Sequence, residues 1–169
     1  HPHLQISINT SPLQYKSEAS SAKAWLEYLQ TLNIPGEAIA VEITERTLME
    51  SGTTIDETLL AFRDANIQVS LDDFGTGHSS LSTLKNLDID YLKIDQLLVG
   101  KLAINSDDLA LCEAIIVMAH KLGLKVIAEG VETEQQRELL LAAGCNYGQG
   151  YLFAKPLTAI EFEALLTSP

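Results

Sequence analysis

The sequence predicts an α/β protein, a TIM-type (β/α) barrel of which about six of the eight βα units lie in these 169 residues. Short segments rich in Val, Ile and Leu alternate with segments whose apolar residues recur at helical spacing, which indicates a parallel sheet covered by helices. Nearly every strand-like segment also ends in a polar or charged residue. This favours the barrel over an open doubly wound sheet, which concentrates its site at one switch point. Because a complete barrel needs eight units and about 250 residues, we expect about two units upstream of His1.

Six segments have the composition of buried parallel strands, because they are short, apolar and bounded by turn-forming residues. They are residues 6–9, 38–44, 68–74, 91–95, 125–130 and 148–153. A segment with helical spacing follows each strand. The expected helices lie at about residues 20–32, 55–65, 79–87, 107–122, 134–143 and 159–166.

Three helix ends have clear sequence signals. Gly123 follows the helix at 107–122 and suits a C-terminal cap. Thr133 and Gln136 have the spacing of a capping box, in which each side chain binds the backbone of the other residue. Thr158 and Glu161 have the same spacing before the final helix.

The composition describes a globular protein and limits its partners. Hydrophobic residues make up 46%, and 23 acidic against 11 basic residues give a net charge of −12, which argues against binding to a nucleic-acid polymer or an anionic membrane. A phosphorylated ligand would need divalent cations between it and clustered carboxylates. Cys112 and Cys145 are isolated, so we expect reduced packing residues in a cytoplasmic protein.

Asp72 and Asp73, in VSLDDFGTG, are the most specific local signal. Adjacent strand residues point to opposite faces, so both carboxylates can reach one centre only where the strand ends. Gly75 and Gly77 allow the sharp turn that this requires. Two such oxygen donors suit Mg²⁺ or Mn²⁺. The alternative is a turn or N-cap for the following helix.

Glu42 lies between Val41 and Ile43 in the second strand, so its side chain faces away from their apolar side and toward the other polar groups. We interpret Glu42 as a metal ligand. Glu45 comes after this strand, and we interpret it as an anchor for the next helix or loop.

Lys93 and Asp95 share one face of the fourth strand. The lysine could form a Schiff base, position water or phosphate as a fixed cation, or form an ion pair with Asp95. From the residues alone we favour the ion pair. The acidic surroundings favour a protonated amine, which disfavours the Schiff base.

Three more polar residues end strands. Glu129, in VIAEG, could be a metal ligand or a general base. Asn9 offers an amide oxygen, which hard cations accept, but it could also start the turn at Thr10. Gln149, before Gly150, has the same two interpretations.

In order and spacing, six motifs from Asn9 to Pro156 resemble the EAL domain of bacterial cyclic-di-GMP phosphodiesterases. They read SINTS, EITE, LDDFGTGHSSLSTL, YLKID, VIAEGVET and GCNYGQGYLFAKP. The resemblance implies a barrel enzyme that linearises cyclic di-GMP to 5′-pGpG through attack of a metal-activated water on one phosphodiester. This agrees with the chemistry inferred from the residues, because two cations can neutralise phosphate and lower the pKa of water.

The same resemblance implies metal ligands. Asn9, Glu42 and Asp72 resemble the ligands of one Mg²⁺ or Mn²⁺ ion, and Asp73 resembles a ligand of the second.

The remaining positions of the motifs resemble supporting groups. Glu129 and Lys93 resemble the groups that hold the metals and the attacking water, with Gln149 nearby. Glu45 resembles the glutamate that anchors the DDFG loop, on the side where we expect a homodimer.

The chain departs from the family pattern in four places. The glutamate of the Glu-Ala-Leu signature, a metal ligand in this family, is absent and is expected upstream, so the activity of this fragment is an open question. His78 stands in the usual place of tyrosine, Asn146 in that of aspartate, and residues 96–98 differ from the common sequence. One alternative is a degenerate EAL domain that binds cyclic di-GMP or another protein. A weaker one is an unrelated lyase or aldolase that uses Lys93.

Sensory or GGDEF-type domains are expected upstream in the parent protein, which could be anchored in a membrane. For the domain itself we expect a cytoplasmic location and no contact with a membrane.

Overall fold

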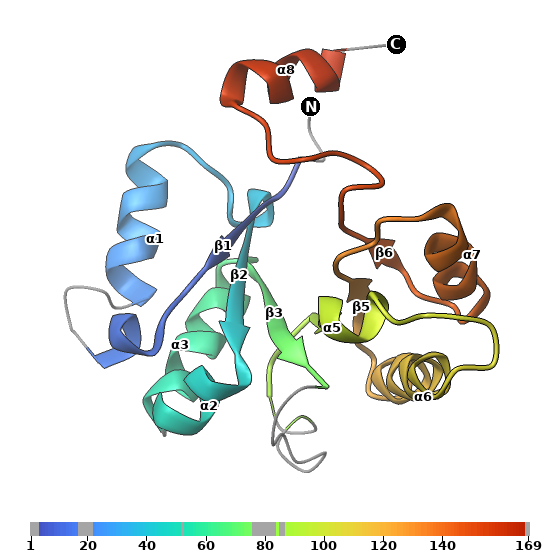
Figure 1. The fold of residues 1–169 in the computed structure, drawn as a ribbon. Coiled ribbons are helices and arrows are strands. Elements are labelled where there is room, and N and C mark those ends of the chain that lie inside the picture. The colour runs from blue at the N-terminus through green and yellow to red at the C-terminus, as the bar shows by residue number, and fades with distance from the viewer. Residues whose placement is uncertain (1–3, 17–21, 52, 76–83, 85–86, 168–169) are drawn as a thin grey trace.

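Six parallel strands form one curved sheet in chain order, β1-β2-β3-β4-β5-β6, in a computed structural model that describes residues 4–16, 22–51, 53–75, 84 and 87–167 (Figure 1). The strands are β1 Ile6–Asn9, β2 Ile39–Thr44, β3 Gln68–Phe74, β4 Tyr91–Ile94, β5 Lys125–Ala128 and β6 Tyr147–Gly148. The predicted fold class, an incomplete TIM-type barrel with six strands, is confirmed. Among the described residues, β1 and β6 are the two free edges of the sheet.

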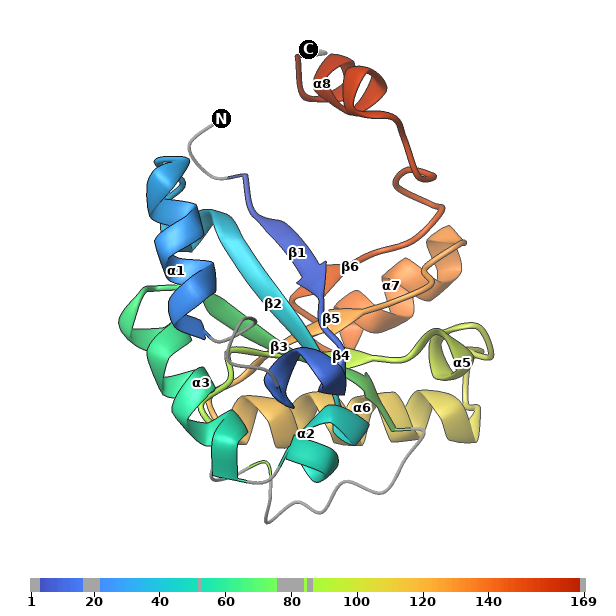
Figure 2. The ribbon, with the colours of Figure 1, turned by 90° about the vertical axis from the view of Figure 1, so that its left-hand side faces the viewer.

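Helices surround the outside of the strands, and only α8 stands away from the rest (Figure 2). The helices are η1 Pro12–Lys16, α1 Ala22–Thr31, η3 Gly36–Ala38, α2 Glu45–Ser51, α3 Thr53–Asp64, α5 Gln96–Val99, α6 Asp107–Lys121, α7 Glu134–Ala142 and α8 Ala159–Thr167. The predicted helices at 20–32, 55–65, 107–122, 134–143 and 159–166 are confirmed within one or two residues at their described ends. The predicted helix at 79–87 lies almost wholly outside the described residues.

The hydrophobic core lies between the sheet and the helices. Alternate strand residues such as Val41, Leu71 and Leu92 are fully buried there, because successive side chains of a strand point to opposite faces. Cys112 on α6 packs in this core, and both cysteines are free, as predicted. The ring centres of Trp25 on α1 and Phe62 on α3 lie 6.1 Å apart, so these side chains pack together.

The intervening strand residues face the concave side of the sheet and are mostly polar. Glu42, Ser70, Asp72 and Lys93 are all buried on this side. Buried polar groups are costly unless they find partners, so this face must satisfy them among themselves or with bound groups. The concave side is therefore where a polar site can form.

The predicted strand at 148–153 is wrong, because pairing stops at Gly148. The backbone of Gly150 approaches that of Val131 so closely that a Cβ atom would lie 2.2 Å from the Val131 oxygen. The chain turns there, with hydrogen bonds from Leu152 N–H to the Val131 carbonyl (3.0 Å) and from Phe153 N–H to the Gly150 carbonyl (3.1 Å). Within the described residues no helix is long and apolar enough to span a membrane.

Candidate active site

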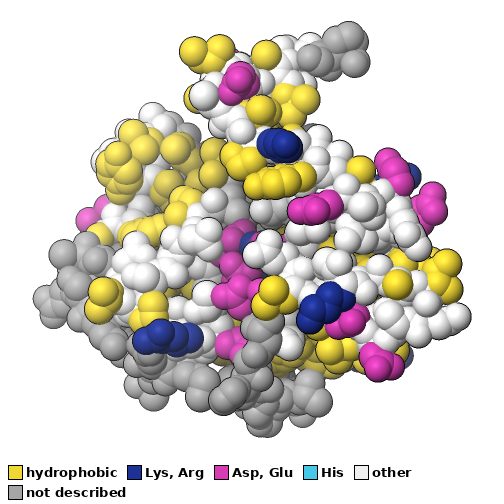
Figure 3. Space-filling model, viewed as in Figure 1, with side chains coloured by type: hydrophobic (Ala, Val, Ile, Leu, Met, Phe, Trp, Pro, Cys, Tyr) yellow, Lys and Arg dark blue, Asp and Glu magenta, His cyan; other side chains and the backbone are white. Residues whose placement is uncertain are grey.

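Four charged side chains meet on the concave face, where β2 to β5 end. The parallel register aligns these strands, and each contributes from the position that alternates with its buried apolar residues. In the space-filling view, acidic side chains gather in the middle of this face (Figure 3). The four residues, here called the acidic cluster with its central lysine, are Glu42, Asp72, Lys93 and Glu129.

Lys93 lies at the centre of this cluster and is 2% exposed. Its Nζ atom is 2.6 Å from Glu42 Oε2, 2.6 Å from Glu129 Oε1 and 3.5 Å from Asp72 Oδ1. Burial opposes the positive charge, but hydrogen bonds to Glu129 and Glu42 outweigh it and raise the pKa of Lys93. The amine is thus held protonated, which agrees with the expectation against a Schiff base because only the neutral amine is nucleophilic.

The predicted ion pair between Lys93 and Asp95 is wrong. The Lys93 ammonium pairs with Glu42, Asp72 and Glu129 instead. Asp95 follows the end of β4 and caps α5, where its Oδ1 accepts a hydrogen bond from Leu97 N–H at 2.6 Å. Spacing along one strand could not reveal this, because the partners of Lys93 come from three other strands.

Asp72 and Asp73 form a bulge in β3. Leu71 pairs with Leu92 and Phe74 pairs with Ile94, so two residues of β3 lie opposite Lys93 alone. Asp73 has a φ of 59°, a left-handed conformation that aspartate adopts more readily than most residues, and its N–H donates to Asp72 Oδ1 at 2.9 Å. The two carboxylates are therefore brought together by the backbone of Asp73 itself, before the glycines that the sequence pointed to.

Glu129 begins the segment 129–133 that leads from β5 to α7. Its N–H donates to the Ile94 carbonyl at 3.0 Å, which continues the pairing between β4 and β5 by one residue. Burial raises the pKa of its carboxyl group, and the hydrogen bond with Lys93 acts in the opposite direction.

The remaining predicted residues surround the cluster at different distances. Asn9 pairs in register with Glu42, and its side chain is exposed at the edge of the sheet. Gln149 has an exposed side chain, while its N–H donates to the Ala128 carbonyl at 2.8 Å. The backbone of Asn9 thus lies beside that of Glu42, and the backbone of Gln149 lies beside Ala128, which precedes Glu129. Among the described residues, neither side chain contacts the cluster.

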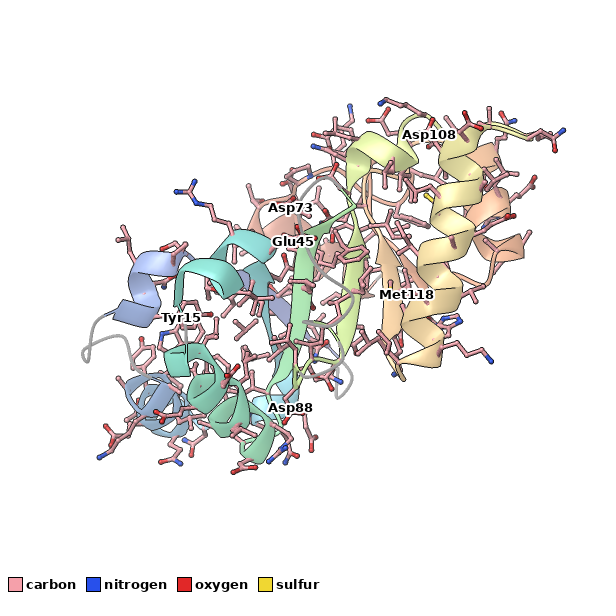
Figure 4. The ribbon with its side chains drawn as sticks, turned by 90° about the horizontal axis from the view of Figure 1, so that it is seen from below. Tyr15, Glu45, Asp73, Asp88, Asp108 and Met118 are labelled. Atoms are coloured by element: carbon pink, nitrogen blue, oxygen red, sulfur yellow. The ribbon has the colours of Figure 1, made fainter. Side chains whose placement is uncertain are left out.

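Glu45 is buried and begins α2 directly after β2. Thr44 and Asp72 are register partners on β2 and β3, and Glu45 and Asp73 are the residues that follow them. Glu45 and Asp73 therefore lie near each other at the carboxyl end of the sheet, as the view from below shows (Figure 4). Residues 76–83, which include most of the loop that Glu45 was predicted to anchor and His78, lie outside the described residues.

The EAL domain family model matches residues 1–156. The chain belongs to the EAL domain family. It is 39% identical over 161 residues to the cyclic di-GMP phosphodiesterase PdeR of Escherichia coli, covering 95% of this chain and 24% of PdeR. It is 38% identical over 168 residues to MucR of Pseudomonas aeruginosa, named a bifunctional diguanylate cyclase and cyclic di-GMP phosphodiesterase, covering 99% of this chain and 24% of MucR. The chain thus spans about a quarter of the length of these relatives.

Solved EAL structures share this fold. The PaMucR phosphodiesterase in complex with c-di-GMP superposes with a TM-score of 0.87 at 37% identity, over 94% of this chain and 70% of that one. Klebsiella pneumoniae BlrP1, in a complex with manganese and c-di-GMP, gives a TM-score of 0.81 at 29% identity, over 90% of this chain and 39% of that one.

The chemistry of the EAL site suits divalent cations that prefer oxygen. Five carboxylates, counting Asp73 and the adjoining Asp95, gather here around a single ammonium that pairs with three of them, which leaves an excess of negative charge. The hydroxyl of Ser70, register partner of Glu42, is buried without a hydrogen-bond partner in the described structure, so this oxygen is left able to bond a water or an ion. No three His, Cys, Asp or Glu side chains in the described ranges are already arranged to hold a metal ion.

A cation bound among these carboxylates would have to displace existing contacts. The Lys93 ammonium occupies the position between the carboxylates of Glu42, Asp72 and Glu129. Glu163-Ala164-Leu165, on the outlying helix α8, has the letters of the family signature but lies away from this cluster (Figure 1).

Replacing Asp73 with asparagine is expected to stabilise the metal-free EAL fold by a few tenths of a kcal/mol and at most about 1 kcal/mol, since Asp73 is well exposed and its charge is screened. Burial, Asp72 and Asp95 all raise the pKa of Asp73, so its charge is unfavourable in the fold, and asparagine tolerates the left-handed φ. The measurement is urea unfolding of both proteins in EDTA.

The pH dependence of this effect has a definite sign. A carboxyl whose pKa is raised by folding destabilises the protein once ionised, so the advantage of D73N should be present at neutral pH and shrink as acidification protonates Asp73. Excess Mn²⁺ should reverse the order, if Asp73 is a ligand. If D73N is less stable than wild type in EDTA at neutral pH, the charge of Asp73 does not destabilise the fold and the prediction is wrong.

Proposed function

We propose that this chain carries most of the active site of a metal-dependent phosphodiesterase that hydrolyses cyclic di-GMP to linear pGpG in bacterial signalling. The supporting observation is the convergence of Glu42, Asp72 and Glu129 on the buried Lys93 ammonium, in an EAL chain whose relatives are named cyclic di-GMP phosphodiesterases. The net charge of the chain is −12, so a dianionic substrate would be repelled unless divalent cations bound at this site neutralised the charge of its phosphates.

The proposed ligands follow the strand ends. Asn9, Glu42 and Asp72 would hold one Mg²⁺ or Mn²⁺ ion, and Asp73 with Glu129 the second. When bound, the two cations would supply neutralisation of the phosphate charge and acidification of water. A complex of BlrP1 with manganese and c-di-GMP supports this choice of metal for the family.

The proposed reaction is an in-line hydrolysis. A water oxygen forms a bond to one phosphorus, the bond from that phosphorus to the ribose O3′ breaks, and O3′ takes up a proton. Glu129 accepts the proton of the attacking water, a task that suits a carboxyl group whose pKa burial has raised. Lys93, at 2.6 Å from Glu129 Oε1, fixes the orientation of that carboxylate. Asp95, Glu45 and Gln149 support the loops around the substrate.

A second candidate is an EAL module that binds cyclic di-GMP or a protein without hydrolysing a substrate. The observation in its favour is that the Lys93 ammonium already lies between the carboxylates of Glu42, Asp72 and Glu129 and partly neutralises them. The two candidates differ in turnover and can share the same binding affinity.

The deciding experiment mixes cyclic di-GMP with this chain, and separately with a longer protein that adds the two βα units expected to complete the barrel, and resolves the nucleotides by ion-pair chromatography. Formation of pGpG that requires Mn²⁺ or Mg²⁺ and stops with EDTA is the expected result for the longer protein. Binding by calorimetry without pGpG from the longer protein would support the module instead. Neither binding nor turnover would overturn both.

We also propose a homodimer formed on the side of the DDFG loop, and a parent protein with upstream sensory or GGDEF-type domains in the cytoplasm. The bifunctional name of MucR, which the chain covers to 24%, supports the second part of this proposal. Sedimentation of the chain with and without its preceding residues tests the dimer.

A further inference from the structure

The short helix α5 lies between the two segments that carry Asp73 and Glu129. A Cβ atom added to Gly75 would lie 2.7 Å from Leu98 Cδ1, and one added to Gly130 would lie 2.6 Å from Gln96 Cβ. Both segments therefore touch α5, and at Gly130 the contact with Gln96 leaves no space for a side chain. Through these contacts α5, which begins after its cap Asp95, touches both the segment after Asp73 and the segment after Glu129.

The side chain of Gln136, on the first turn of α7, is buried and makes three hydrogen bonds. Its Oε1 atom accepts from the N–H groups of Glu132 (2.8 Å) and Thr133 (3.0 Å), and its Nε2 donates to the Val99 carbonyl at the end of α5 (3.2 Å). The capping box accounts for the bond from Thr133 N–H to Oε1, and a glutamate oxygen can accept that bond and the one from Glu132 equally well. Only an amide supplies the third bond as well, since ionised glutamate has no donor.

We infer that Gln136 is a positioning residue for Glu129. Through one side chain it joins the backbone of the segment 129–133 to the end of α5, and with the contact at Gly130 it fixes that segment against α5 at both ends. The 2.6 Å contact between Glu129 and Lys93 depends on this placement. The inference rests on the proposed function for its catalytic meaning, whereas the placement itself can be measured separately.

Gln136→Glu separates the two tasks, because it keeps the acceptor of the capping box and removes the donor to Val99. Gln135→Glu is the matched control: it makes the same chemical change at the adjacent, exposed position of α7. Each protein is titrated with Mn²⁺ and followed by electron paramagnetic resonance well below its melting temperature, and amide exchange of residues 129–133 is followed by mass spectrometry in EDTA.

Gln136→Glu should bind Mn²⁺ about 10- to 100-fold more weakly, the range found when partners of metal ligands are removed, and residues 129–133 should exchange faster. Gln135→Glu should match wild type in both measurements. A purely structural role would speed exchange throughout the protein or lower the melting temperature while leaving Mn²⁺ affinity unchanged, which would overturn the inference.

If Gln136→Glu does not fold, Gln136→Met takes its place; because methionine loses the capping-box acceptor as well as the donor, it is compared with Thr133→Ala, which weakens the capping box alone. Absence of Mn²⁺ binding by wild type would count against the proposed function, and exchange in 129–133 would then decide the positioning role. Exchange and affinity equal to those of Gln135→Glu would overturn it.

Discussion

Replacing Lys93 with methionine is expected to lower the free energy of unfolding by about 3–5 kcal/mol, the cost of removing one partner from a buried ion pair. The Lys93 ammonium lies within 3.5 Å of three carboxylates and is 2% exposed, so its loss leaves Glu42, Asp72 and Glu129 facing one another without compensation. Methionine has a similar length, so the loss of packing is small by comparison. Chemical denaturation in EDTA at neutral pH measures the effect.

Lys125→Met is the matched control, since it removes the same charge from the same face of the adjacent strand. Lys125 is exposed, and its Nζ lies 5.8 Å and 5.9 Å from the ring centres of Tyr91 and Tyr147. Contacts of this kind at exposed positions contribute about 0.5–1 kcal/mol. Equal losses of unfolding free energy in Lys93→Met and Lys125→Met would contradict a greater stabilising effect of the buried Lys93.

If the proposed phosphodiesterase activity holds, replacing Glu129 with glutamine is expected to lower its kcat by about 10²- to 10⁴-fold, the usual contribution of a general base. Glutamine has the same shape, and burial already favours the uncharged form of this carboxyl group, so the free energy of unfolding should stay within about 1 kcal/mol of wild type. Single-turnover hydrolysis of cyclic di-GMP under saturating Mn²⁺ gives the rate.

Glu134→Gln is the control for this change. Glu134 is exposed on α7, and its carboxylate lies 2.7 Å from the Arg137 guanidinium. The kcat and the free energy of unfolding of Glu134→Gln should therefore remain near those of wild type. Full activity of E129Q would remove Glu129 from the proton transfer, and a large loss of stability would instead assign it a structural role. The two variants are expected to differ, because Glu129→Gln should mainly lower kcat whereas Lys93→Met should mainly lower the free energy of unfolding.

Local sequence signals predicted most elements because they depend on neighbouring residues. The capping box of Thr133 and Gln136 forms as expected, and Gly123 follows α6 with a positive φ of 82°. The alternation of Glu42 with Val41 and Ile43 correctly placed the glutamate opposite the core. These features follow from backbone geometry over a few residues, so no distant contact can change them easily.

The errors occurred where distant segments decide the structure. The strand expected at 148–153 ends at Gly148, because the backbone of Gly150 packs against Val131. The short helix α5 was not predicted at all, since four residues carry no periodic signal and its place depends on the cap from Asp95 and on contacts with Gly75 and Gly130.

The sequence alone determined the α/β class, the polar strand ends and, through six motifs, the resemblance to the EAL family. Tertiary structure alone decided how the charges combine: which carboxylates surround Lys93, that a bulge brings Asp73 beside Asp72, and that Gln136 joins the segment 129–133 to the end of α5. The physical reason is that periodicity and capping act over a few residues. Ion pairs and register arise between strands far apart in the chain, and the curvature of the sheet brings them together.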